Sequence, residues 1–217
     1  TLSLHDALPI WLMYDKGEGV PQSYKQAVAW YTKAAEQGDA YAQYNLGLIY
    51  YAGKGVPQND AQAVVWWQKA AEQGHASAQF NLGNMYDNGR GVSQDYTQAV
   101  VWYTKSAEQG DASAQYSLGR MYREGEGVPL DDAQAVVWYT KAAEQGQVNA
   151  QSNLGYMYGH GQGVPQDDAQ SLKWYKKAAE QGDAGAQCNL GVMYDNGQGI
   201  PQDYKQDRKS TRLNSSH

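Results

Sequence analysis

The chain has 217 residues, with 23 acidic against 17 basic side chains, a formal net charge of −6 and a single cysteine. Binding to a nucleic-acid backbone needs clustered cations, so the acidic balance argues against a nucleic-acid partner. A lone cysteine also excludes a framework of internal disulfides.

One short polar stretch recurs six times at a constant spacing of 36 residues. The copies are GVPQSY from residue 19, GVPQND from 55, GVSQDY from 91, GVPLDD from 127, GVPQDD from 163 and GIPQDY from 199. No residue is inserted or lost between Gly19 and Gly199, so the period, more than the length, decides the organisation. We expect a repeat array.

The register fails at residues 1–10 and 207–217, and both segments read as translations of sequencing-library adapters. We interpret them as artefacts and exclude them from fold and function. On this interpretation the array occupies residues 11–206, with 14 basic and 21 acidic residues, and the natural N-terminus is missing. The location is then left open among cytoplasm, periplasm and secretion. Unbroken genomic reads through either junction, from a library made with other adapters, would refute the interpretation.

Each repeat predicts two helices, which we call helix A and helix B. In residues 40–75, helix A is expected over roughly 40–51, because apolar residues fall on one helical face at Ala42, Leu46, Ile49 and Tyr50. Helix B is expected over roughly 60–73, with its stripe at Ala63, Trp66 or Trp67, Ala70 and Ala71. The complete copies are 40–75, 76–111, 112–147 and 148–183, between partial copies at 11–39 and 184–206.

Capping residues mark the predicted helix ends. A glycine follows each helix B, where a left-handed residue is needed: Gly38, Gly74, Gly110, Gly146 and Gly182. Polar residues that cap helices follow, namely Asp39, Asp111 and Asp183 before helix A, and Asn59, Asp95, Asp131, Asp167 and Asp203 before helix B. Short turns give antiparallel neighbours, and one hairpin cannot enclose a core. The expected fold class is an all-α, right-handed α/α solenoid of 36-residue helix-turn-helix repeats.

A glycine inside each helix A needs an explanation, because glycine costs about 1 kcal/mol relative to alanine there. The copies are Gly47, Gly83, Gly119, Gly155 and Gly191. We expect another helix to approach each of these glycines so closely that a side chain at the position would block the approach.

The GxGV loops resemble anion-binding turns only superficially. The stretch GKGV before Pro57 has no third glycine, no preceding strand and no Lys-Ser/Thr pair, so we assign these loops a structural role. His75 and His160 occupy different places in their repeats and are interpreted as solvated turn residues, so no metal site is expected. No nucleophile, base and orienting group converge, and we expect neither an enzyme nor a cofactor.

The aromatic residues of helix B fall into two sets. Trp66 and its copies are assigned to the core, and the following tyrosines to its boundary, with the hydroxyl reaching water or a backbone group. These tyrosines are Tyr31, Tyr103, Tyr139 and Tyr175.

The recurring pattern A-x-x-x-L-G-x-x-Y-x-x-G-x-G-V-x-x-D-x-x-x-A-x-x-W-x-x-x-A-A-x-x-G closely resembles the Sel1-like repeat of the tetratricopeptide-like superfamily, over residues 11–206. The tetratricopeptide repeat itself is shorter, with about 34 residues. The resemblance implies a bacterial α/α solenoid that acts as a non-catalytic scaffold or adaptor. Cysteine-rich relatives have been linked to β-lactam binding or hydrolysis, but Cys188 has no second thiol to pair with, so this branch is not supported.

Residues that differ among the repeats carry the functional prediction. Four positions of helix A vary and share a face away from the apolar stripe, and the resemblance implies that the A helices line a concave groove. We expect this face to bind a peptide, loop or helix of another protein, since aromatics beside arginine are typical of interface hot spots. The candidate residues are Tyr41, Tyr44, Leu48, Tyr51, Phe80, Asn84, Asp87, Tyr116, Arg120, Arg123, Tyr156 and Asp195. An alternative is that Tyr44, Phe80 and Tyr116 only pack between neighbouring A helices.

Two other functions are kept open. A secreted or envelope module could bind glycan or cell-wall material through its tyrosines, and a β-lactam-active hydrolase is disfavoured by the single cysteine. No membrane segment is expected in the fragment.

Overall fold

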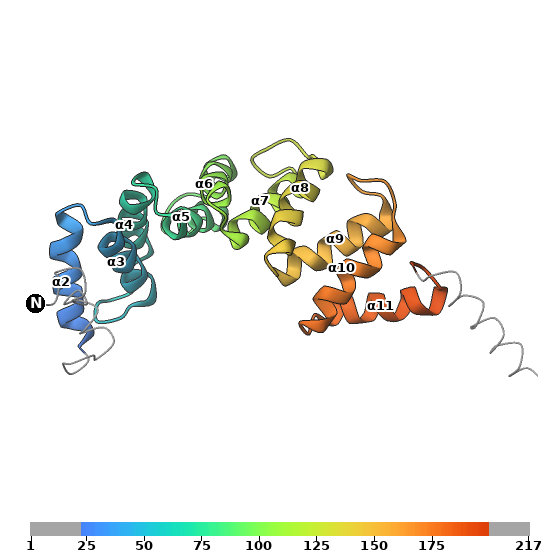
Figure 1. Ribbon diagram of the computed structural model, residues 1–217. Helices are drawn as coiled ribbons and strands as arrows, with labels where there is room; N and C mark the ends of the chain where they lie inside the picture. Colours follow the sequence, from blue (N-terminus) through green and yellow to red (C-terminus); the bar gives the residue numbers. More distant parts are fainter. Residues whose placement is uncertain (1–22, 200–217) are drawn as a thin grey trace, which may run out of the picture. The chain divides into compact units, whose positions relative to one another are not determined.

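The computed structural model describes residues 23–199, and both interpreted adapter segments, with the capping prediction for Asp203, lie outside them. The chain divides into two compact units, Thr1–Asp111 and Ala112–His217, which we call unit 1 and unit 2. All regular structure in the described residues is helical (Figure 1).

Each described helix has 13 residues, and helices A and B alternate as predicted. Unit 1 contains α2 (Tyr24–Glu36), α3 (Ala40–Ala52), α4 (Asp60–Glu72), α5 (Ala76–Asn88) and α6 (Tyr96–Glu108). Unit 2 contains α7 (Ala112–Glu124), α8 (Asp132–Glu144), α9 (Val148–His160), α10 (Asp168–Glu180) and α11 (Ala184–Asn196). Consecutive helices pack against each other within each unit, so each unit is a stretch of all-α solenoid.

Caps at the helix ends follow the sequence prediction. Asn59 accepts a hydrogen bond from the Gln62 N–H at 3.0 Å, and Asp39 accepts one from the Ala42 N–H at 2.7 Å. Asp95, Asp131, Asp167 and Asp183 cap α6, α8, α10 and α11 in the same way. These side chains satisfy amide groups that have no partner inside a helix.

Within each unit, the glycine-rich loop of one repeat packs against helix B of the repeat before it. In the loop after α5, Gly91 has a φ of 69°, and a Cβ there would lie 2.5 Å from the carbonyl group of Asp60 at the start of α4. Glycine is therefore required both by the left-handed backbone and by the close approach. The repeated GVPQD stretch serves geometry, as predicted.

Within unit 1, a chain of glutamine hydrogen bonds runs from repeat to repeat, and the sequence analysis did not find it. Buried Gln43 donates to the Ala35 carbonyl at the end of α2 at 3.0 Å, and accepts from Gln73 at the end of α4 at 2.7 Å. Gln79 and Gln109 repeat the arrangement one repeat later. Each bond satisfies a buried polar group at a helix end, which would otherwise be costly.

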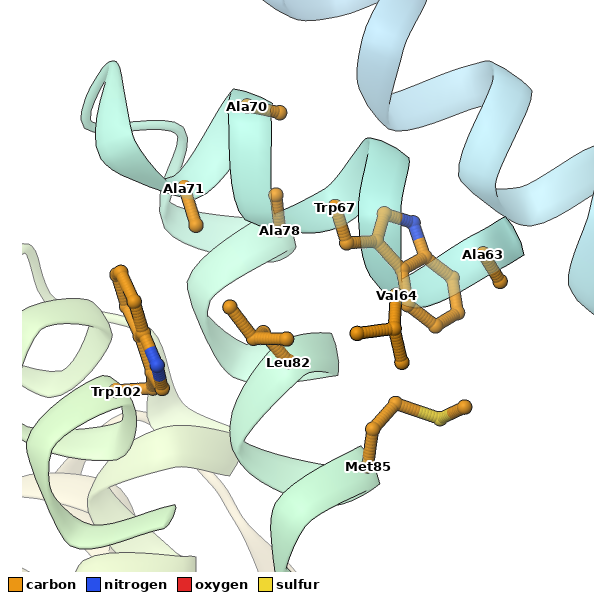
Figure 2. Close-up of a cluster of buried hydrophobic side chains, with 9 residues drawn as sticks. All are labelled: Ala63, Val64, Trp67, Ala70, Ala71, Ala78, Leu82, Met85 and Trp102. Atoms are coloured by element: carbon orange, nitrogen blue, oxygen red, sulfur yellow. The ribbon is translucent and has the colours of Figure 1, made fainter. Parts of the chain in front are cut away.

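The aromatic assignment within helix B was wrong for the tyrosines. Tyr31, Tyr103, Tyr139 and Tyr175 are buried, as is Trp67 at the same position, whereas Trp30 is 38% exposed. The rings of Trp67, Tyr103, Tyr139 and Tyr175 face the A helix of their own repeat. Trp66 and Trp102 belong to clusters that join buried residues of their own repeat and of the preceding one. Figure 2 shows Trp67 beside Val64 and Met85, with Trp102 on the other side of Leu82.

The helix A glycines lie directly against these buried rings. A Cβ on Gly83 would lie 2.7 Å from the Tyr103 ring, and a Cβ on Gly119 would lie 2.7 Å from the Tyr139 ring. Gly47 meets Trp67 and Gly155 meets Tyr175 in the same way. The expected close approach is confirmed at these four glycines, and the approaching group is an aromatic side chain. At Gly191, no described residue lies within 4 Å of a Cβ.

Candidate functional site

A hollow of about 350 Å³ lies between α3 and α5 in unit 1, and we call it the α3–α5 hollow. Both helices are A helices. The lining residues are Leu48, Tyr51, Trp67, Asn81, Asn84, Met85, Asn88 and Arg90. The hollow therefore combines apolar and aromatic walls with amide and guanidinium groups, as binding pockets commonly do.

Arg90 is the charged group of this hollow. Its Nε and Nη2 donate to Asp60 Oδ2 at 3.2 and 3.0 Å, and its Nη1 donates to the Tyr51 hydroxyl at 2.8 Å. The guanidinium also lies over the Tyr51 ring, 4.7 Å from the centroid. Arginine has five N–H donors, so two have no partner among the described residues, and the side chain is 43% exposed.

Asn84 and Asp87 both lie within hydrogen-bond reach of the Tyr103 hydroxyl, whose oxygen is 2.7 Å from Asn84 Oδ1 and 3.1 Å from Asp87 Oδ2. The hydroxyl has one proton, so it donates to one of the two at a time.

A smaller hollow of about 240 Å³ adjoins the first and shares Leu48 and Tyr51 with it. Tyr31, Asn45, Ile49, Ala52 and Lys54 complete its lining. Lys54 lies 5.7 Å from the centroid of the Tyr24 ring and has no ion pair in the described part of the chain. The two hollows thus place Lys54 and Arg90 on one face of unit 1.

Unit 2 has a hollow at the equivalent place, between α9 and α11, which we call the α9–α11 hollow. It measures about 240 Å³, and its lining residues are Gly159, His160, Asp168, Ser171, Tyr175, Asn189, Val192, Met193 and Gln198. A shift of 108 residues, three repeats, relates Arg90 to Gln198 and Asn84 to Val192. Asp168 corresponds to Asp60 but has no ion pair among the described residues. The chemistry of the two hollows therefore differs.

Three of the aromatic residues predicted for the binding face, Tyr44, Phe80 and Tyr116, are half-buried. Tyr44 stacks on His75, with ring centroids 4.5 Å apart, and burial raises the pKa of its hydroxyl. Phe80 lies against Tyr103 at 5.9 Å, and Tyr116 lies against Tyr139 at 5.7 Å. Phe80 and Tyr116 therefore contact the B helix of their own repeat.

The two predicted arginines have internal partners. Arg120 Nη1 pairs with Glu124 and Glu126 at 2.6 Å each, and Arg123 Nη1 donates to Asn153 Oδ1 at 3.0 Å. Arg123 also lies over the Tyr156 ring, 5.2 Å from its centroid. The charges of this part of unit 2 are thus largely satisfied within the chain.

Three predicted residues lie in the α3–α5 hollow, namely Leu48, Tyr51 and Asn84. Asp87 accepts from Tyr103, Tyr156 stacks on His160, and Tyr41 and Asp195 are exposed on α3 and α11. The sequence analysis missed Asn81, Asn88 and Arg90. Arg90 could have been noticed, because the loop position that it occupies holds Lys54, Glu126, Gln162 and Gln198 in the other repeats.

His75 is a helix cap, which corrects its interpretation as a solvated turn residue. Its Nδ1 accepts from the Ala78 N–H at 3.3 Å, and partial burial lowers its pKa. His160 is exposed and stacks on Tyr156. Cys188 is exposed, and no cluster of three His, Cys, Asp or Glu side chains suitable for a metal ion occurs in residues 23–199.

The comparison with known families identifies the class. The Sel1 repeat profile matches residues 12–39, 40–75, 76–111, 112–147, 148–183 and 184–206, and the chain belongs to the Sel1 repeat family. Proteins of this family are generally non-catalytic scaffolds for protein interactions. None of the described helices has both the length and the apolar character to cross a bilayer.

Solved structures give the same result. The chain is similar to c5321, described as a protective antigen of uropathogenic Escherichia coli, with 48% identity and a TM-score of 0.86 over 92% of this chain and 43% of that one. It thus spans less than half of c5321. A Sel1 repeat protein from Oxalobacter formigenes is 40% identical, with a TM-score of 0.78 over 91% of this chain and 80% of that one. One from Klebsiella pneumoniae is 29% identical, with a TM-score of 0.51 over 79% and 82%. A search of curated proteins gave no significant match.

Proposed function

We propose that this chain is a non-catalytic interaction scaffold that binds a peptide, loop or helix of a partner protein along the face formed by its A helices. The observation that carries the proposal is the recurrence of a hollow between successive A helices, at α3–α5 and again at α9–α11. The frame of the repeat is constant, while the residues lining the hollows differ. A repeat scaffold obtains specificity in this way.

The tyrosines support protein binding over glycan binding. A glycan platform needs aromatic rings open to solvent, but among the tyrosines of residues 23–199 only Tyr41 is exposed, at 47%. The other rings are buried or half-buried and contribute to packing. A glycan array should therefore give no signal that depends on Tyr41.

The face can be tested with a displayed library of random peptides. Asn88 is exposed and lines the α3–α5 hollow, so Asn88→Tyr should fill the hollow without disturbing the core. Val65 is 45% exposed on the B helix α4, and Val65→Tyr is the matched control. We expect selected peptides to lose binding to Asn88→Tyr and to retain it with Val65→Tyr. Loss with the control alone would place the binding face on the B helices and contradict the proposal.

A further inference from the structure

The charges around the α3–α5 hollow balance one another. The Arg90 guanidinium is paired with Asp60 at 3.0 Å, and the other oxygen of that carboxylate, Oδ1, is buried without a hydrogen-bond partner in the described residues. The Asp87 carboxylate lies within reach of the same Tyr103 hydroxyl as Asn84. A charged ligand of either sign would therefore lie close to a group of like charge, and an uncharged group fits the site better.

The hydrogen-bonding groups that remain in the hollow are of both kinds. Arg90 has two N–H groups without a partner in the described residues. Asn88 donates one N–H to the Asn84 carbonyl at 2.9 Å, and its Oδ1 accepts no hydrogen bond within residues 23–199. A peptide group carries one N–H donor and one carbonyl acceptor, so the main chain of a ligand is an uncharged partner that uses both kinds.

The amides of α5 form a row. Asn81, Asn84 and Asn88 occupy positions i, i+3 and i+7, so they share one face of the helix, and all three line the hollow. The row extends over about 10 Å, which is the length of about three residues of an extended chain. In the adjoining hollow, Asn45 holds the place of Asn81 one repeat earlier, and its Nδ2 donates to the Tyr41 carbonyl at 2.8 Å. A segment that crosses α3 and α5 thus meets an asparagine on each helix.

The rest of the lining is apolar and is suited to one side chain. Leu48 comes from α3 and Met85 from α5, and the Trp67 ring contributes from α4. The Trp67 Nε1 already donates to the Tyr44 carbonyl at 3.1 Å, so the ring offers only apolar surface to a ligand. The volume of about 350 Å³ accommodates one aliphatic or aromatic side chain next to the polar row.

We propose that the α3–α5 hollow binds an extended, uncharged segment of a partner protein by its main chain, and takes one apolar side chain of that segment. Arg90 donates to a main-chain carbonyl, and Asn88 accepts from a main-chain N–H. The apolar side chain lies against Leu48 and Met85. A helical segment cannot bind in this way, because its main-chain groups are bonded within the helix. The inference rests on the proposed function and narrows the partner to an extended segment.

Unit 2 supplies a matched control. Asn196 holds the place of Asn88 three repeats later and is exposed near the end of α11. The α9–α11 hollow has Gln198 at the place of Arg90 and Val192 at the place of Asn84, so it lacks the cation and one amide of the row. The same substitution at Asn196 therefore changes an equivalent helix end without touching the proposed site.

The experiment selects peptides from a displayed random library with the full chain, and then measures the affinity of synthetic copies by titration. We expect the selected peptides to share an apolar residue among uncharged neighbours, and to bind almost independently of salt. A second set of copies carries a methyl group on one main-chain nitrogen at a time. Methylation next to the apolar residue removes an N–H donor and should weaken binding about threefold or more.

Variants of the chain locate the contacts. Arg90→Gln should bind the peptide about tenfold or more weakly, because a charged donor is lost. Asn88→Leu keeps the size of the side chain but removes the amide, and should bind about threefold to tenfold more weakly. Asn196→Leu should leave the affinity unchanged. Circular dichroism shows whether each variant is folded.

The outcomes separate this inference from the proposed function. Selected peptides that bind as helices, that tolerate methylation at every nitrogen, or that require a charged residue and weaken in salt overturn the main-chain mode but leave the scaffold. Loss with Asn196→Leu and retention with Asn88→Leu also overturns the site. If every selected peptide binds Asn88→Tyr with full affinity, both proposals are overturned.

A second copy is an occupant that the chain itself can supply, because Leu130 is 66% exposed in the loop before Asp131. Sedimentation measures whether the chain associates with itself. Self-association that is lost in both Leu130→Gln and Asn88→Tyr would assign the hollow to a second copy and overturn a separate partner.

Discussion

Unit 1 and unit 2 share the same repeat geometry, but their polar side chains are paired within the chain to different extents. In unit 1, Arg90 donates to Asp60 and Tyr51 and keeps two N–H groups without a partner in the described residues. In unit 2, Arg120 is paired with two glutamates, and Arg123 with Asn153. Under the proposed function, the α3–α5 face of unit 1 therefore offers more unpaired polar groups to a partner than the face of unit 2 that carries Arg120 and Arg123.

The first prediction concerns the helix packing that both units share, because substitutions there have the largest expected effect on stability. Gly83→Ala in unit 1 and Gly119→Ala in unit 2 each force a Cβ against a buried tyrosine ring. We expect each to lower the free energy of unfolding by about 1–3 kcal/mol, although alanine has the higher helix propensity. Chemical denaturation measures the change. Gly185→Ala is the control, since only the Asp183 carboxylate lies near a Cβ there, and it should not destabilise. Stabilisation by either core substitution would contradict the packing.

The caps of helix A give a pH-dependent difference between the units. His75 caps α5 through Nδ1, while Gln147 caps α9 with an amide that does not titrate. The pKa of His75 is lowered in the folded state, so the unfolded chain takes up its proton first as the pH falls. The stability of the His75 cap is present above pH about 6.5 and is lost as the pH falls through the lower, folded pKa. Protonation also places a positive charge at a helix N-terminus.

The measurement is the unfolding free energy at pH 8 and pH 5 for the unaltered chain and for His75→Asp, which restores the residue found at Asp39 and Asp183. A cap contributes about 1 kcal/mol, and this part of the pH dependence should disappear in the variant. An equal pH dependence in both proteins would show that His75 does not cap through an unprotonated Nδ1.

The buried tyrosines should also respond differently. The Tyr103 hydroxyl bonds to Asn84 and Asp87, whereas the Tyr175 hydroxyl has no hydrogen bond in the described residues, and burial raises its pKa to about 12. We expect Tyr103→Phe to cost about 0.5–1.5 kcal/mol and Tyr175→Phe to change stability by less than about 0.5 kcal/mol. The same denaturation assay compares the two variants. An equal loss of unfolding free energy in both would contradict this difference between the units.

The smallest effect is expected for the exposed ion pairs of unit 2. Arg120→Gln removes two contacts to partly exposed glutamates, and such pairs contribute about 0–1 kcal/mol each. The loss should shrink in high salt. A loss that is larger and independent of salt would indicate that Arg120 is a buried packing residue.

Periodicity made the fold predictable, because the 36-residue repeat places every helix-capping residue and every apolar helix face at a known position in the sequence. The predicted helices over 40–51 and 60–73 correspond to Ala40–Ala52 and Asp60–Glu72. The sequence did not predict whether Trp66 or Trp67 points toward helix A of the same repeat. The two neighbours differ by only about 100° around the helix, and both directions are apolar. The contact with Gly47 decides it, and this contact lies between two helices.

The candidate site was harder to predict for a physical reason. Variation in helix A pointed to Leu48, Tyr51 and Asn84, but it gave no information on which polar groups already have partners. From the sequence alone, Arg120 and Arg123 resemble Arg90. The structure distinguishes them from Arg90, because they are bonded to glutamates and to Asn153. Arg90 also lies in a loop that was interpreted as purely structural.

The most direct test of the difference between the units compares Arg90→Gln with Arg123→Gln, which remove the same charge from the two A-helix faces. Affinity for a peptide selected from a displayed random library is measured by titration with each folded variant. We predict a loss of about tenfold or more for Arg90→Gln and an unchanged affinity for Arg123→Gln. Loss with Arg123→Gln and retention with Arg90→Gln would contradict the account and place the binding site in unit 2.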